Sequence, residues 1–402
     1  MKILSLTTIY PNEQMDAEGR SVRFLDQALA KIGVGGTTLV LKPWVPLWLA
    51  EHSDRWKHLA VRRKIEESDG LRVIFSHYLH IPARYRLDLC VYAMTYQAIR
   101  LIRKYGWEFD VVHGECIYPA SLAARLVARY FRVPFIITLR DDLSHLQDLY
   151  EMREAQKFFG PMFASVSAIF LIGPALMKNI SAFLPPKAQP QLILAPNGVD
   201  IDGLEFFLHN LPKPSGHSWG RIVSVGNLYR FKGIHENLHA LRLLDERGFK
   251  DWHYTVVGHG PYRKELESQA KEKGLGERVK FVGRLPHREA IRQIWDADIF
   301  SLPSWEEPFG NVYSEAAVCG RPAIGCRGFG AELTIRDGAT GILVPPKDVS
   351  ALADALLLLL TLPEQARKMG EEAQRHIRQF TWDRTAQIYK ESISQVLSKG
   401  SL

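Results

Sequence analysis

The stretch that decides the fold runs from Ile299 to Cys326 and reads IFSLPSWEEPFGNVYSEAAVCGRPAIGC. An apolar run over residues 299–302 breaks at a Pro-Ser pair, and a second apolar run occupies residues 323–326. Between these runs the apolar residues recur with helical spacing. The stretch therefore predicts a strand, a loop, a helix and a second strand, which is the repeating unit of a parallel sheet.

The loop and the helix of this unit carry residues suited to an anionic ligand. Glu307 precedes the predicted helix and Glu315 lies inside it, with seven residues between them. Phe309, Gly310 and Asn311 lie where the helix begins, and a helix start presents unpaired N–H groups and the positive end of the helix dipole. Glycine lets the backbone approach a ligand closely. The sequence therefore predicts a site for an anion such as a phosphate at this loop.

The whole string resembles the donor-site signature of retaining glycosyltransferases of family 4, in the GT-B superfamily, which is written as two glutamates with seven residues between them. The resemblance is strongest from residue 195 to residue 390 and looser before it. It implies a sugar transferase of the kind that assembles bacterial polysaccharides and glycoconjugates. The matching positions are Pro303-Ser304, Glu307-Pro308-Phe309-Gly310, Glu315-Ala316 and Gly320-Arg321-Pro322.

The resemblance implies an α/β fold of the GT-B type, with two doubly wound Rossmann-like domains facing a central cleft. The length of 402 residues fits two domains. We expect an acceptor-binding domain over residues 1–205 and a nucleotide-sugar donor-binding domain over residues 206–375. A C-terminal helix within residues 376–402 would cross back to the first domain. The polar stretch at residues 209–220 is the expected linker.

The charge balance and the cysteines set limits on partners and location. The chain has 51 basic and 44 acidic residues, a net charge of +7, which suits a phosphorylated ligand or an anionic membrane surface better than nucleic acid. We therefore expect no nucleic-acid partner. The four cysteines lack metal-ligand spacing and read as buried, reduced thiols of a cytoplasmic protein. The first residues read as a strand and not as a signal peptide.

The segment at residues 42–64 has an unusual composition. It holds three tryptophans, and from Arg55 to Lys64 it has five basic residues and no acidic one. Two interpretations stay open. The segment is a membrane-interface element, giving peripheral contact with the inner face of a membrane, or it is a helix whose aromatic side chains pack inward and whose basic face is solvated.

A lysine follows the predicted strand at residues 221–225. Lys232 lies where the family places the lysine that meets the donor diphosphate, and a lysine at a strand-to-helix turn neutralises phosphate charge without a metal. We therefore expect no metal and no cofactor, only a nucleotide-diphosphate sugar as co-substrate. The family's second cation is replaced by Asn227, and Arg230 is close enough in sequence to substitute for it.

Other donor-side residues follow from the resemblance. Gly258 belongs to a Gly-x-Gly pattern after a strand, which dinucleotide-binding folds share. Arg284 lies in a neighbourhood that the family places beside the nucleotide base. Glu307 would orient the sugar hydroxyls and Glu315 would hold the ribose. The expected catalytic residues are Glu307 and Lys232, and the expected donor-binding residues are Asn227, Arg230, Gly258, Arg284, Phe309, Gly310, Asn311, Val312 and Glu315.

The expected acceptor-side residues lie in the first half of the chain. Gly19 and Arg20 follow the first strand, in a loop that either meets a ligand or only connects two elements. His113 ends a predicted strand, where a structural role is the alternative to a place in the cleft. The family has a second histidine at the position of Glu115 and often a histidine at the position of Arg140. These departures leave the chemistry of the acceptor side open.

Two short motifs receive geometric interpretations. The sequence Asn197-Gly198 predicts a turn in which one of the two residues adopts a positive φ. The sequence Asp296-Ala297-Asp298 spells the metal-binding motif of a different glycosyltransferase fold. Here it directly precedes the strand at residue 299, so we interpret its carboxylates as helix-end and strand-start groups.

The implied reaction is the transfer of a sugar from a UDP- or GDP-linked donor to a hydroxyl of a glycan or a lipid-linked saccharide. The anomeric configuration is retained, and the leaving diphosphate accepts the proton of the acceptor. One alternative is a nucleotide-sugar epimerase, which shares the two-domain shape. Another is a non-catalytic sugar-nucleotide-binding protein, which the departures at Asn227 and Glu115 keep open.

Overall fold

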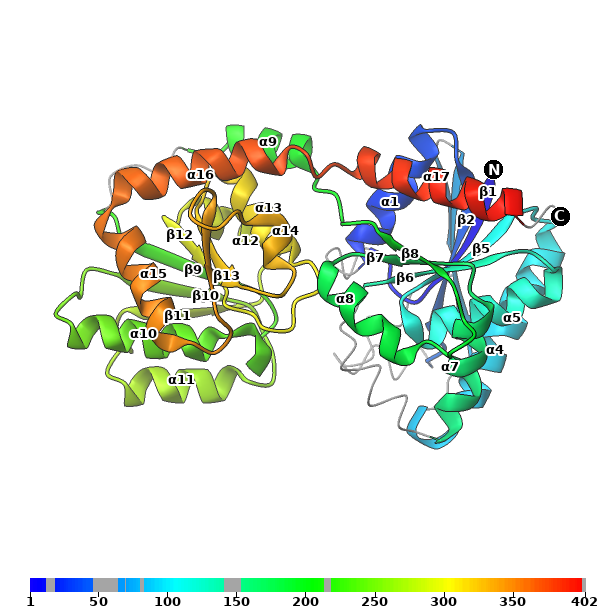
Figure 1. The fold of residues 1–402 in the computed structure, drawn as a ribbon, viewed down its shortest axis with the longest axis horizontal. Coiled ribbons are helices and arrows are strands. Elements are labelled where there is room, and N and C mark those ends of the chain that lie inside the picture. Colours follow the sequence, from blue (N-terminus) through cyan, green and yellow to red (C-terminus); the bar gives the residue numbers. More distant parts are fainter. Residues whose placement is uncertain are drawn as a thin grey trace. The chain divides into compact units, whose positions relative to one another are not determined.

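The computed structural model describes residues 1–11, 19–45, 64–68, 70–79, 83–140, 153–212 and 218–399. The chain divides into two compact units (Figure 1). Met1–Gly198 and Trp382–Leu402 form the first unit, and Val199–Thr381 forms the second. The domain boundaries expected from the sequence lie after residues 205 and 375, whereas the two units divide after residues 198 and 381.

The first unit is built on an eight-stranded sheet with the order β3-β4-β2-β1-β5-β6-β7-β8. All neighbouring strands are parallel except β3, which pairs with β4 in the antiparallel sense and was not expected from the sequence. The strands are β1 (Lys2–Thr7), β2 (Gly35–Pro43), β3 (Ile65–Ser68), β4 (Leu71–Tyr78), β5 (Val111–Glu115), β6 (Phe135–Leu139), β7 (Ala168–Leu171) and β8 (Gln191–Leu194).

Helices cover both faces of this sheet (Figure 1). The first and last helices, α1 and α17, contact each other on one face, and α4, α5 and α7 contact one another on the other face. The helical segments are α1 (Arg20–Lys31), α4 (Ala83–Tyr105), η1 (Ile117–Ser121), α5 (Leu122–Phe131), α7 (Arg153–Ser165), α8 (Pro174–Asn179), η2 (Ile180–Phe183) and α17 (Trp382–Lys399).

The C-terminal helix α17 is part of the first unit's core. The ring of Tyr389 stacks on Phe170 of β7, with the ring centroids 3.9 Å apart. Trp382 and Ala386 pack in the same buried cluster as Ile3. Burial of large aromatic side chains is a major source of stability, so the first unit depends on residues from both ends of the chain.

The second unit has a six-stranded parallel sheet with the order β11-β10-β9-β12-β13-β14. From β9 the chain moves outward to β11 and then returns to place β12 on the other side of β9. The strand order therefore reverses between β9 and β12, and ligands of such sheets bind at the carboxyl edge of this switch point. The strands are β9 (Arg221–Val225), β10 (His253–Val257), β11 (Val279–Gly283), β12 (Ile299–Ser301), β13 (Ala323–Cys326) and β14 (Gly341–Val344).

The helices of the second unit also form two layers. α10 contacts α11 and α15, whereas α12 contacts α13 and α9, and Figure 1 shows these groups on opposite faces of the sheet. Both units are therefore doubly wound, which confirms the expected fold class. The helical segments are α9 (Ile201–His209), η3 (Arg230–Lys232), α10 (Ile234–Glu246), α11 (Arg263–Glu272), α12 (His287–Trp295), α13 (Asn311–Val318), α14 (Ala331–Thr334), α15 (Val349–Thr361) and α16 (Pro363–Ile377).

A buried polar network fixes the strands on either side of the switch point. The side-chain amide of Asn237 in α10 donates to the hydroxyl of Tyr254 at 3.0 Å and to the carbonyl of Ser301 at 3.1 Å. The Ser301 hydroxyl donates back to the Asn237 carbonyl oxygen at 2.7 Å. Because buried polar groups are costly when unpaired, this network holds β10, β12 and α10 in one arrangement.

The structure bears on two interpretations made from the sequence, those of Asp298 and of the cysteines. Asp298 accepts the backbone N–H groups of Gly220 and Arg221 at 2.9 and 2.8 Å, which is the expected strand-start role of that carboxylate. All four cysteines are buried and form no disulfide. Of the segment at residues 42–64, residues 46–63 lie outside the described part of the chain.

No single helix in the described residues is long and apolar enough to cross a membrane. The helices α15 and α16 meet that condition only as a pair, and the pair is bent by 101°.

Candidate functional site

The loops after β9 and β12 lie against each other at the carboxyl edge of the second unit's sheet. The backbone N–H of Trp305 donates to the carbonyl of Phe231 at 3.0 Å. Gly233 has a φ of 72°, and a Cβ atom there would lie 2.2 Å from the carbonyl oxygen of Pro303. Only glycine fits at this position, because both the conformation and the close approach exclude a side chain.

This contact brings together the two residues expected to be catalytic. The ammonium of Lys232 donates to a carboxylate oxygen of Glu307, although the residues are 75 positions apart in sequence. Each side chain is 15% exposed, so the pair is neither sealed in the core nor fully solvated. A cation and an anion in such a position remain available to a ligand that enters from the edge of the sheet.

The backbone of the loop after Glu307 is held tightly. The Glu307 carbonyl accepts the N–H of Gly330 at 2.7 Å, and a Cβ on Gly330 would lie 2.4 Å from Phe309. Gly310 has a φ of 76°, and a Cβ there would lie 2.5 Å from the ring of Tyr313. The loop therefore has one backbone path into α13.

Helix α13 begins at Asn311, as the sequence predicted, and Gly310 is its N-cap. No side chain caps this end. Asn311 is exposed and Val312 is half-buried, so the first turn lies at the surface. The positive end of the helix dipole and the N–H groups of the first turn favour an anion here.

Glu315 lies one turn further along α13 and contacts a residue that the sequence analysis missed. Its carboxylate oxygen Oε1 lies 2.7 Å from Nε2 of His287, the first residue of α12. The side chains are 17% and 16% exposed. No motif points to a lone histidine; the only available signal was that α12 leads directly into β12 and so packs beside α13.

The remaining expected donor-side residues lie in the loops of this edge but outside the contact between Lys232 and Glu307. Gly258 has a φ of 145°, and a Cβ there would meet the carbonyl of Gly226, so this glycine permits close packing of two loops. The side chains of Asn227, Arg230 and Arg284 are exposed. Within the described residues, these three side chains form no hydrogen bond or ion pair.

In the first unit, two residues that depart from the family pattern form one ion pair. Arg140 Nε lies 2.7 Å from Glu115 Oε2, and Arg140 Nη2 lies 3.1 Å from Glu115 Oε1. The side chains are 6% and 1% exposed. Burial alone would lower the pKa of Arg140, but the charge of Glu115 and its hydrogen bonds raise that pKa above its ordinary value. The guanidinium of Arg140 therefore stays charged in the folded protein.

Arg140 also ties this pair to the end of the first unit. Its Nη1 donates to the side-chain oxygen of Asn197 at 2.7 Å. Asn197 is buried, and neither it nor Gly198 has a positive φ. The prediction of a positive-φ turn was therefore wrong, because the side chain of Asn197 is required as an acceptor and not as a turn former.

His113 belongs to the same buried region. Its Nε2 lies 2.7 Å from the hydroxyl of Thr138, and its Nδ1 lies 3.4 Å from the hydroxyl of Ser5. The Thr138 hydroxyl is also 2.7 Å from the hydroxyl of Tyr389. Burial lowers the pKa of His113, so its imidazole is neutral. These contacts fit the structural alternative, and a role for His113, Glu115 or Arg140 in acceptor binding stays a prediction.

Gly19 and Arg20 begin helix α1 in the first unit. Gly19 has a φ of 74°, and a Cβ there would lie 2.6 Å from the backbone of Ile9 and Tyr10. The guanidinium of Arg20 lies 5.6 Å from the centre of the Phe24 ring. The close backbone approach explains the glycine as a connector, and the loop at residues 12–18 lies outside the described residues.

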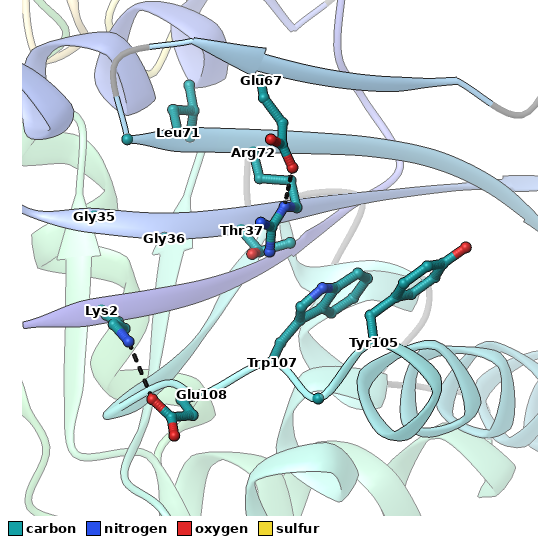
Figure 2. A pocket seen from close by; sticks show the side chains of 12 residues that line it. Lys2, Gly35, Gly36, Thr37, Glu67, Leu71, Arg72, Tyr105, Trp107 and Glu108 are labelled. Carbon is teal, nitrogen blue, oxygen red and sulfur yellow. Dashed lines mark hydrogen bonds and ion pairs between the residues drawn. The ribbon is translucent and has the colours of Figure 1, made fainter.

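A pocket of about 640 Å³ lies at the opposite edge of the first unit's sheet, near the amino ends of β1, β2 and β4. Figure 2 shows Trp107 beside Tyr105, and the ion pairs of Lys2 with Glu108 and of Arg72 with Glu67. None of the expected site residues lines it. Because ligands of parallel α/β sheets bind at the carboxyl edge, we place the functional site elsewhere.

Comparisons with known proteins agree with this geometry. Residues 218–376 match the family described as glycosyl transferases group 1. The glycogen synthase of Mycobacterium tuberculosis is 26% identical over 407 aligned residues, which cover 97% of this chain and 94% of the relative.

Two solved structures share the fold over the whole chain. A sucrose-phosphate synthase from Thermosynechococcus elongatus has a TM-score of 0.75 at 21% identity, covering 99% of both chains. The Anabaena protein HepE, solved in complex with UDP-glucose, has a TM-score of 0.69 at 19% identity, covering 98% of this chain and 100% of that one. At such identities the likeness shows the fold and not the substrate.

We expect Arg140→Met to lower the free energy of unfolding by about 3–5 kcal/mol, because it leaves the buried carboxylate of Glu115 without a partner. The double variant Glu115→Leu/Arg140→Met removes both charges and should be less destabilised than Arg140→Met alone. Denaturant unfolding monitored by circular dichroism measures both. A double variant as unstable as the sum of the two single changes would show that the pair is not coupled.

The buried carboxyl of Asp26 in α1 should make the free energy of unfolding depend on pH. Burial raises the pKa of its carboxyl from 3.8 to about 7. From about pH 4 to about pH 7 the folded state therefore binds a proton that the unfolded state has released, and the free energy of unfolding falls as pH rises. The difference between the two pKa values corresponds to about 4 kcal/mol. Below pH 4 this stabilisation is fully present.

Asp26→Asn keeps an oxygen acceptor for the Thr38 hydroxyl, which donates to Asp26 at 2.7 Å, but it cannot ionise. We expect the stability of the variant relative to the natural protein to increase from pH 4 to pH 8. Denaturant unfolding across this range measures the difference. Parallel stability curves for the two proteins would contradict a raised pKa of Asp26.

Proposed function

We propose that the chain is a GT-B glycosyltransferase that transfers a sugar from a nucleotide-diphosphate donor to an acceptor hydroxyl with retention of the anomeric configuration. The observation that carries this proposal is the contact of Lys232 with Glu307 at the switch point, beside the start of α13. A cation, a carboxylate and a helix start at one sheet edge suit a ligand that has both phosphates and hydroxyls.

The proposed roles follow from the chemistry of each group. Lys232 and the first turn of α13 would hold the two phosphates and stabilise the charge that grows on the diphosphate as it leaves. Glu307 would accept hydrogen bonds from hydroxyls of the donor sugar. The leaving diphosphate would take the proton of the attacking hydroxyl on the same face, which gives retention without a covalent enzyme intermediate.

We propose that this chemistry needs no metal ion. The negative charge of the diphosphate would be balanced by the ammonium of Lys232 and by the dipole of α13. Arg230 and Arg284 are exposed in neighbouring loops and are candidates for additional phosphate or base contacts. Where the family has a second cation, this chain has the exposed Asn227. Lys232 would therefore supply a larger part of the positive charge that binds the diphosphate.

The proposed donor is a UDP- or GDP-linked sugar, and the proposed acceptor is a glycan or a lipid-linked saccharide. The relation to a glycogen synthase supports a glycan acceptor. The tryptophan-rich basic segment at residues 42–64 supports a peripheral contact with the cytoplasmic face of a membrane, where a lipid-linked acceptor would be met.

We expect one nucleotide among UDP, GDP, ADP and their sugar conjugates to raise the melting temperature by several degrees at about 100 times its Kd, in buffer with EDTA. Lys232→Ala should abolish this shift, whereas Lys264→Ala, at an exposed position of α11, should keep it. Differential scanning fluorimetry measures both. If no nucleotide stabilises the natural protein, the donor-site assignment is wrong.

Glu307→Gln should lower turnover about 100-fold or more while nucleotide binding remains, because the side chain contacts the sugar and not the base. Product formation from the stabilising donor and a panel of glycan acceptors, followed by proton NMR of the new anomeric centre, measures rate and stereochemistry together. Unchanged turnover in Glu307→Gln would contradict its role. Conversion of the donor to its epimer without an acceptor would favour the epimerase alternative.

A further inference from the structure

The contact between His287 and Glu315 joins two helices at the donor edge of the second unit. His287 begins α12, which follows β11, and Glu315 lies in α13, which follows β12. Nε2 and Oε1 are 2.7 Å apart. A carboxylate can only accept a hydrogen bond, so the imidazole donates and Nε2 carries the proton.

The pair has features that separate it from an ordinary surface ion pair. Both side chains are largely buried, at 16% and 17% exposure, whereas Arg292 in α12 and Asp296 directly after it are each more than 40% exposed and lie 3.8 Å apart. Exposed pairs hold their side chains weakly because solvent competes for them. The burial of His287 and Glu315 therefore fixes the direction of the Glu315 carboxylate.

Only one oxygen of that carboxylate is used. Oε1 accepts from His287, and Oε2 accepts no hydrogen bond from any residue in the described part of the second unit. Because Oε1 is held by His287, Oε2 has a defined position, in which it can accept hydrogen bonds from hydroxyl groups. An oxygen held in this way can accept hydrogen bonds from the hydroxyls of a vicinal diol, such as a ribose.

We propose that His287 is a positioning residue that fixes Glu315 so that its second oxygen reads the ribose hydroxyls of the donor nucleotide. The inference rests on the proposed function. It adds His287 as a residue that supports donor binding, and it adds a preference for a ribonucleotide. His287 itself touches no substrate. It acts by removing the rotational freedom of Glu315, and the pair together discriminates a ribonucleotide from its deoxy form.

The test is a binding cycle measured by titration calorimetry at constant pH. The ligands are the nucleoside diphosphate that stabilises the natural protein and the 2′,3′-dideoxy form of the same nucleotide. The proteins are the natural chain, His287→Ala, His287→Gln, Glu315→Ala and the double variant. His253→Ala serves as the matched control, because His253 is an exposed histidine that begins β10, at the opposite edge of the same sheet.

We expect His287→Ala to weaken binding of the ribonucleotide about tenfold and to leave binding of the dideoxynucleotide unchanged. In the Glu315→Ala background the same change should have no further effect. His287→Gln keeps an N–H donor and should restore part of the affinity. His253→Ala should bind both ligands as the natural protein does.

Three results would overturn the inference. These are equal weakening of both ligands by His287→Ala, an unchanged affinity for the ribonucleotide, and an effect that persists in the Glu315→Ala background. Circular dichroism confirms that each variant is folded, and His287→Gln carries the comparison if His287→Ala unfolds. Failure of the natural protein to bind any nucleotide would instead overturn the proposed function.

Discussion

The site of the second unit depends on one steric constraint, the contact between the loops that follow β9 and β12. Gly233 lies so close to Pro303 that a single Cβ atom would push the two loops apart. The backbone hydrogen bond from Trp305 to Phe231 fixes the same approach. Without this contact, the loops that carry Lys232 and Glu307 would lie apart, and the two side chains could not share one ligand. The steric requirement at a glycine is therefore what turns two distant sequence positions into one site.

Two ion pairs in the described residues, Arg140–Glu115 and Lys232–Glu307, differ in what they leave available to a ligand. In the first unit, Arg140 is bidentate to Glu115 and donates from Nη1 to Asn197, so all three of its nitrogens are hydrogen-bonded within the protein. In the second unit, Lys232 and Glu307 are each partly exposed. A closed pair stabilises a particular packing, because separating it is costly, whereas a pair that solvent still reaches can exchange its partner for a ligand.

The fold and the main site residues could be predicted from the sequence because they depend on local patterns. The alternation of apolar runs predicted units of a parallel sheet, and the family resemblance implied that these form two doubly wound domains. The local pattern also placed Glu307 in the loop before a helix and Glu315 inside that helix, as the structure has them. The pairing of Glu115 with Arg140 could not be predicted, since each residue was interpreted alone and their contact requires β5 and β6 to be adjacent. His287 was missed for the same reason. Its role comes from the packing of α12 on α13, which no short motif encodes.

The departures at Glu115 and Arg140 are better understood as one change than as two. A single acidic or basic residue buried in place of a histidine would carry an uncompensated charge, which costs several kcal/mol. The two together carry no net charge and form two hydrogen bonds with each other. The side chain of Asn197 also takes part, because it accepts a hydrogen bond from Arg140 Nη1. The first unit has thus kept a satisfied polar edge with a different composition, so its departures do not by themselves argue against catalysis.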